Sequence, residues 1–134
     1  MTLFDILPLL AGLVAAGFVL ALALRPHPLG PDAWIGAAIL CAAFSGWSLF
    51  AILTGGPFGF WVEHTRNAWG VQIWFDLLLA ASCALVVMVP QARGLGMRPL
   101  PWVVLVICSG AIGLSAMLAR ILYLKARAPQ AGRG

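Results

Sequence analysis

Long apolar runs separated by short polar segments dominate the pattern of this chain. Four runs, at about residues 3–24, 33–54, 69–89 and 101–124, are each long enough to cross a hydrocarbon core of about 30 Å, which takes about 20 helical residues. Backbone amides in lipid must bond within their own segment, so these runs are predicted to be helices rather than strands. The pattern predicts an all-α membrane protein, a bundle of four transmembrane helices.

The connections between the runs differ in character. Residues 25–32 contain three prolines and predict a tight turn, because proline suits the first turn of a helix and not its interior. Residues 55–68 combine aromatic with charged side chains, a composition typical of a segment in the headgroup region. Residues 90–100 predict a compact turn, and residues 125–134 form a polar tail.

Composition supports a single integral membrane domain over residues 1–134. Hydrophobic residues make up 63% of the chain and charged residues 9%, against roughly 25% charged in a soluble domain. The first run has no preceding Lys or Arg and is longer than the core of a signal peptide, so we expect it to remain as an uncleaved helix. The expected location is the inner membrane, with several crossings.

The net charge of +4 comes from basic residues that flank the runs. Such residues orient a membrane protein and contact anionic headgroups, so the expected partner is the lipid bilayer and not nucleic acid. With four crossings, the two faces carry Arg66, Lys125, Arg127 and Arg133 against Arg25, Arg93 and Arg98. A balance of four against three leaves the orientation open and favours only weakly two cytoplasmic termini.

Asp76 is a carboxylate inside the run 69–89, where the only other ionisable side chain is Cys83. A charge at that depth costs at least about 2.5 kcal/mol even on the lenient insertion scale. If the third and fourth helices are antiparallel, Asp76 and Arg120 lie at similar depth and their side chains tilt toward each other. They are then either a structural ion pair or part of a site, unless Arg120 extends to the headgroups instead.

A polar pocket is predicted around this pair, open toward residues 55–68. Its candidate ligand-binding residues are Asp76, Arg120, Gln72, Arg66 and Tyr123, and its candidate catalytic residues are Asp76, Glu63 and His64. Carboxylate, imidazole and guanidinium groups can orient a lipophilic molecule with one polar end, or move a proton. The sequence does not decide between these two uses.

No metal or cofactor is expected from the sequence. His27 and His64 fall in connections on opposite faces, so they do not predict a shared metal site. No histidine lies within a run, which argues against a haem held between helices, and no phosphate-binding or dinucleotide motif is present.

Small residues recur at helical spacing in two of the runs. Ala38, Ala42 and Gly46 follow one another at intervals of four, as do Ser109 and Gly113. Such stripes let membrane helices approach closely, and packing within the bundle is their predicted use.

Three short segments resemble a family of short bacterial integral membrane proteins of unknown function. They are Trp74-Phe75-Asp76-Leu77-Leu78, Arg93-Gly94-Leu95-Gly96-Met97 and Leu122-Tyr123-Leu124-Lys125-Ala126-Arg127. The resemblance covers residues 35–127, so the first helix would be an addition to a three-span pattern. It implies a membrane fold with a shared Asp76 but no activity. A fainter likeness, to membrane proteins of carotenoid and terpenoid metabolism, rests on the same aspartate and helix end.

Two functions are compatible with these patterns. The first is a non-catalytic membrane protein that binds a lipophilic small molecule or serves as an accessory subunit of a larger membrane complex. The second is a membrane enzyme acting on an isoprenoid or carotenoid-type substrate, with Asp76 or Glu63 as general acid and Arg120 or Arg66 orienting the substrate.

Overall fold

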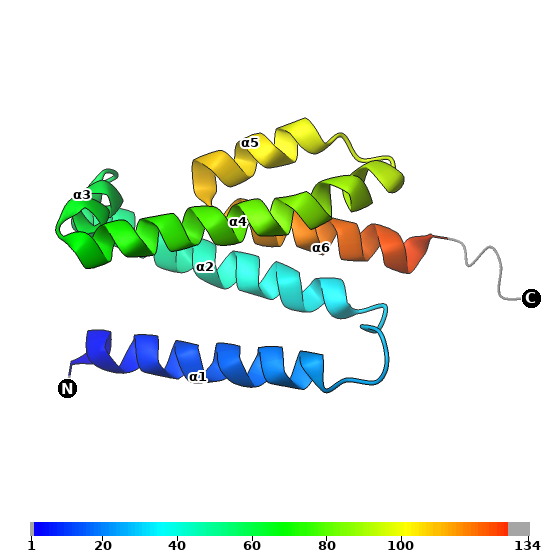
Figure 1. The fold of residues 1–134 in the computed structure, drawn as a ribbon, viewed down its shortest axis with the longest axis horizontal. Coiled ribbons are helices and arrows are strands. Elements are labelled where there is room, and N and C mark those ends of the chain that lie inside the picture. The colour runs from blue at the N-terminus through cyan, green and yellow to red at the C-terminus, as the bar shows by residue number, and fades with distance from the viewer. Residues whose placement is uncertain (1, 129–134) are drawn as a thin grey trace, which may run out of the picture.

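The computed structural model describes residues 2–128, and over that range all of its secondary-structure elements are helices. In order along the chain the helices are α1 (Leu3–Ala23), α2 (Ala33–Gly55), α3 (Gly59–Thr65), α4 (Ala68–Gly94), α5 (Pro99–Ser109) and α6 (Ala111–Arg127) (Figure 1). Among the described residues, three helices are long and apolar enough to cross a membrane, namely Phe4–Ala23, Ala33–Gly55 and Ala68–Gly94. The prediction of an all-α protein with long apolar helices is confirmed.

Local signals define the two ends of α4. Asn67 caps its start, because the side-chain oxygen accepts a hydrogen bond from the Gly70 N–H at 2.9 Å. At its end Gly96 has a positive φ of 73°, and the Met97 N–H donates to the Ala92 carbonyl at 2.9 Å. This is a Schellman motif, and Met97 completes it by packing on the hydrophobic cluster that contains Ala92. The motif turns the chain sharply from α4 into α5.

The run 101–124, predicted as one helix, is two helices that meet at Gly110. This glycine has φ 58° and ψ −121°, a backbone conformation that any side chain disfavours strongly. The chain reverses there, so α5 and α6 form an antiparallel hairpin (Figure 1). At Gly113 a Cβ atom would lie 2.6 Å from the Val106 nitrogen, so the two backbones touch directly. The prediction of a single fourth helix was wrong.

Because of this reversal, α6 runs in the same direction as α4 (Figure 1). Both helices end together, where the Lys125 ammonium donates to the Gln91 side-chain oxygen at 2.6 Å. Their shared core consists of Met88 and Ala92 from α4 and Met117 and Ile121 from α6. The end of α6 therefore lies beside residues 24–32 and 95–98, on the opposite side from that predicted for the tail (Figure 1). Residues 129–134 of the tail, with Arg133, lie outside the described residues.

The face of α2 that meets α6 differs from the predicted small-residue stripe. Ala37 is buried, and the Cys41 thiol donates to the Ile112 carbonyl at 3.5 Å. Gly46, by contrast, is exposed, and a Cβ added there would meet nothing within 4 Å. The prediction that Gly46 permits a close helix approach was wrong, whereas Gly113 does so within the α5–α6 hairpin.

α1 stands apart from the other helices. It contacts no other described helix, and every α1 side chain that the structure describes is exposed (Figure 1). A helix that is apolar on all sides suits lipid, where no single face has to be covered by protein.

Candidate functional site

Five of the seven predicted site residues fall into two clusters at opposite ends of the bundle. We call the end formed by residues 24–32, residues 95–98 and the last turn of α6 the basic end, and the end formed by α3 and the start of α4 the α3 end (Figure 1). Arg120 and Tyr123 belong to the basic end, whereas Glu63, His64 and Arg66 belong to the α3 end. The single pocket predicted from the sequence does not form among the described residues.

At the basic end, an open pocket of about 340 Å³ lies between the start of α2, the start of α5 and the second half of α6. It is lined by Trp34, Ala38, Trp102, Ala116, Ala119, Arg120 and Tyr123. The Trp34 ring meets the Tyr123 ring edge to face, with centroids 5.4 Å apart. Aromatic and small apolar groups thus form the walls, and Arg120 supplies the only charge.

Arg120 and a second cation, Arg127, both lie against the ring of Tyr123. The Arg120 guanidinium lies 5.6 Å from the centre of the Tyr123 ring, and the Arg127 guanidinium lies 4.7 Å from the same ring. Each contact is a cation–π interaction, worth about 0.5–1 kcal/mol at an exposed position. Within residues 2–128 no carboxylate lies at ion-pair distance from Arg120. A chemical group that complements this pocket is therefore apolar at one end and anionic at the other.

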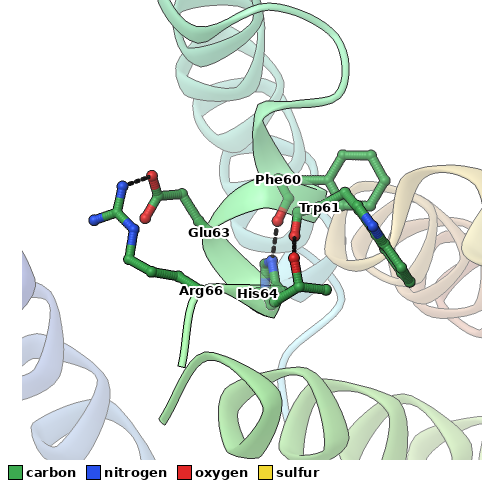
Figure 2. Close-up of polar contacts among 6 residues, drawn as sticks. Phe60, Trp61, Glu63, His64 and Arg66 are labelled. Carbon is green, nitrogen blue, oxygen red and sulfur yellow. Dashed lines mark hydrogen bonds and ion pairs between the residues drawn. The ribbon is translucent and has the colours of Figure 1, made fainter. Parts of the chain in front are cut away.

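At the α3 end, a second pocket of about 400 Å³ is lined by Glu63, His64, Arg66, Asn67, Trp69, Gly70 and Ile73. Glu63 and Arg66 form an ion pair at 2.6 Å, with both side chains exposed (Figure 2). The His64 Nδ1 lies 2.6 Å from the Phe60 carbonyl, one helical turn back, which leaves Nε2 free of that contact (Figure 2). Acid, base and guanidinium groups are adjacent here, but the carboxylate is already matched by its own arginine.

Close packing holds this corner in place. The end of α3 lies directly on the start of α4. The two backbones are so close that a Cβ added at Gly70 would lie 2.5 Å from the Glu63 carbonyl oxygen. The His64 ring meets the Trp74 ring edge to face at 5.0 Å, and Phe60 lies 6.2 Å from the same indole. The sequence analysis predicted this segment as a connection in the headgroup region and did not predict the helix α3 within it.

Asp76 and Gln72 line neither pocket, and both are exposed on α4. The predicted Asp76–Arg120 ion pair is absent from the described structure, in which Glu63–Arg66 is the ion pair that forms. The reason is the direction of α6, which places Ile121, the residue next to Arg120, in the cluster with Met88 rather than at the level of Asp76. Asp76 and Met88 are twelve residues apart on α4, which is about 18 Å by helical rise.

Sequence reasoning missed Trp34 and Trp102 as walls of the first pocket. The sequence held a signal for both residues, because each lies in the first turn of its helix and both helices begin at the basic end. At the α3 end, Asn67 and Gly70 were also missed. Asn67 held a signal, because asparagine is a preferred N-cap residue and Asn67 stands just before the apolar run. A glycine that touches a neighbouring backbone has no such signal.

Comparisons of the chain with protein-family models, with curated proteins and with solved structures find no match. The fold itself defines a class, an all-helical protein whose three long apolar helices fit a membrane protein. The resemblance carried by residues 74–78, 93–97 and 122–127 stays a prediction.

Proposed function

We propose that this protein is an integral membrane protein of the inner membrane that binds a lipophilic small molecule with an anionic end. The observation that carries the proposal is Arg120, a guanidinium with no ionic partner among the described residues, in the wall of an aromatic and apolar pocket. A phosphate or carboxylate would match the guanidinium, since charge-assisted hydrogen bonds to such anions are strong. The hydrocarbon part of the ligand would lie against Trp34 and Trp102.

The proposed membrane arrangement has three crossings and a re-entrant hairpin in place of the four crossings predicted. α1, α2 and α4 cross the bilayer. α5, with 11 residues, is about 16 Å long and reaches about half-way through a 30 Å core before the chain turns back. Because the chain returns along α6, the hairpin enters and leaves at the basic end. α3 then lies at the opposite surface, where its exposed Phe60 and Trp61 suit the headgroup region.

The arrangement also supports one orientation. The basic end and the helix termini next to it carry Arg25, Arg93, Arg98, Lys125 and Arg127, whereas the α3 end carries Arg66, which Glu63 neutralises. Basic residues accumulate on the cytoplasmic side of membrane proteins. We therefore propose a cytoplasmic basic end and an N-terminus on the opposite side, in place of the two cytoplasmic termini weakly favoured by the sequence.

This orientation predicts opposite behaviour of reporters fused to the two ends of the chain. A green fluorescent protein at the C-terminus is expected to fluoresce, and alkaline phosphatase at the same position to be inactive. At the N-terminus, a tag is expected to be accessible to protease from outside the membrane. Two ends exposed on the same side would contradict the hairpin and restore a four-crossing arrangement.

Ligand binding is tested with a matched pair of probes, farnesyl phosphate and farnesol, and the protein in zwitterionic nanodiscs. Quenching of tryptophan fluorescence is expected to give tighter binding of the phosphate by about tenfold or more, since a hydrogen bond to a charged group is worth about 1.5–3 kcal/mol. Arg120→Gln is expected to abolish that preference and leave farnesol binding unchanged.

Arg66→Gln is the matched control, because it removes a guanidinium from the other end of the molecule. It is expected to keep the preference for the phosphate. Equal affinities of the wild-type protein for the two probes, or loss of the preference in the Arg66 variant alone, would refute binding at Arg120.

An enzyme acting on an isoprenoid-type substrate is the second candidate function. The adjacency of Glu63, His64 and Arg66 at the α3-end pocket favours it. A mechanism that combines Asp76 as acid with Arg120 as orienting group does not fit the separation of these residues, so Glu63 is the remaining candidate acid. Loss of product formation in Glu63→Gln, with farnesyl phosphate binding unchanged, would support this function over simple binding.

A further inference from the structure

Asp76 lies on a face of α4 that no other part of the described chain covers. The residues one turn and two turns away on this face, Gln72, Ile73, Leu79, Ala80 and Cys83, are all exposed. α4 meets α3 at its start through Trp74, and the cluster that it shares with α6 begins at Ala84. Between these two contacts the Asp76 face of the helix is open, and Asp76 is the only charged side chain between Trp74 and Ala84.

The position of Asp76 in the proposed membrane makes this exposure costly. Asp76 is eight residues from Ala68, about 12 Å along the helix, and eighteen residues from Gly94, about 27 Å. A charged side chain facing hydrocarbon is strongly disfavoured and normally faces a partner. Lysine and arginine can extend to the headgroups, but an aspartate side chain is too short to do so from this depth.

Within residues 2–128, no cation lies at ion-pair distance from Asp76. Arg66 is held by Glu63, and Arg120 lies about 18 Å further along the bundle by helical rise. α1 could approach this face, but it contains no Lys or Arg.

A second copy of the chain does not supply one either. In a parallel dimer the copy would present the same residues at the same depths, so its Arg120 would again be distant. An inverted copy would match the depths, but the one-sided distribution of basic residues opposes an inverted insertion.

We propose that the Asp76 face of α4 docks a transmembrane helix of another protein that carries a lysine or arginine at the depth of Asp76. Charge complementarity specifies the partner residue, and the small side chains of Ala80 and Cys83 allow a close approach of the two helices. Such docking would make this protein an accessory subunit of a larger membrane complex. The proposed docking rests on the proposed membrane placement but not on the ligand pocket at Arg120.

The test uses synthetic transmembrane helices of alternating leucine and alanine in phosphatidylcholine vesicles. One peptide carries a single lysine level with Asp76, a second carries leucine there, and a third carries the lysine two turns deeper. Each bears a dansyl group that accepts energy from the tryptophans of the protein. The peptide with the lysine level with Asp76 is expected to bind about tenfold more tightly than the other two. Tenfold corresponds to about 1.4 kcal/mol, which is typical of an interhelical polar contact in model membrane peptides.

Three variants of the protein complete the design. Asp76→Asn is expected to reduce the lysine peptide to the affinity of the leucine peptide, and Asp76→Glu to retain the preference. Asp32→Asn, which removes an exposed carboxylate just before α2 and outside both pockets, is the control and is expected to retain it as well.

Equal binding of the three peptides by the wild-type protein would overturn the proposal, and so would a lysine preference that persists in Asp76→Asn. Asp76-dependent self-association without a lysine preference would identify a second copy as the occupant instead. The peptides do not use Arg120, so failure of the farnesyl phosphate experiment leaves this result unaffected.

Discussion

Replacing Gly113 with alanine is expected to destabilise the protein by about 1–3 kcal/mol, the usual cost of overpacking. The added Cβ would lie 2.6 Å from the Val106 nitrogen and 2.7 Å from the Leu105 carbonyl carbon, both backbone atoms. Backbone cannot move aside as a flexible side chain can, so α5 must shift away from α6. Unfolding in mixed micelles of a mild detergent and sodium dodecyl sulfate, followed by circular dichroism, measures the loss of stability.

Gly46→Ala is the matched control for this prediction. The same methyl group on α2 meets nothing within 4 Å, so only the better helix propensity of alanine remains, a gain of up to about 1 kcal/mol. The two variants are thus expected to change stability in opposite directions. Destabilisation by Gly46→Ala with no effect at Gly113 would mean that α2, and not the α5–α6 hairpin, contains the close helix contact.

Replacing Met117 with alanine is expected to cost about 2–5 kcal/mol. Met117 has no exposed surface and lies in the cluster with Met88, Ala92 and Ile121, where α6 packs on α4. Removing its side chain leaves a cavity that the surrounding backbones cannot fill without moving. The same detergent unfolding experiment measures the change.

Leu118→Ala provides the comparison, since Leu118 is next in sequence on the same helix but 39% exposed. Its loss is expected to cost less than about 1 kcal/mol, because a lipid-facing side chain leaves no internal cavity. Similar costs at the two positions would contradict the parallel packing of α4 and α6, on which the division of the site into two pockets depends.

The charged residues of the two pockets were predicted from the sequence, but their grouping was not. Glu63, His64 and Arg66 are close in sequence and stay close in space, within one short helix and the residue after it. Arg120 and Asp76 were brought together only by the assumption that residues 101–124 cross the membrane once. That assumption failed at Gly110, and both residues lost the partner proposed for them.

The sequence by itself determined the helical class, the extents of α1 and α2 within one residue, and the start of α4. It placed the end of α4 five residues too early, because α4 continues through Pro90 to Gly94, into the predicted turn 90–100. Hydrophobic length and the need to bond the backbone in lipid are local properties, so they can be read along the chain. The tertiary structure alone decided the direction of α6. A glycine in an apolar run is compatible with a continuous helix or with a reversal, and the close contact between Gly113 and the α5 backbone selects the reversal. That contact joins two helices across a turn, so it cannot be predicted from the hydrophobic pattern along the chain.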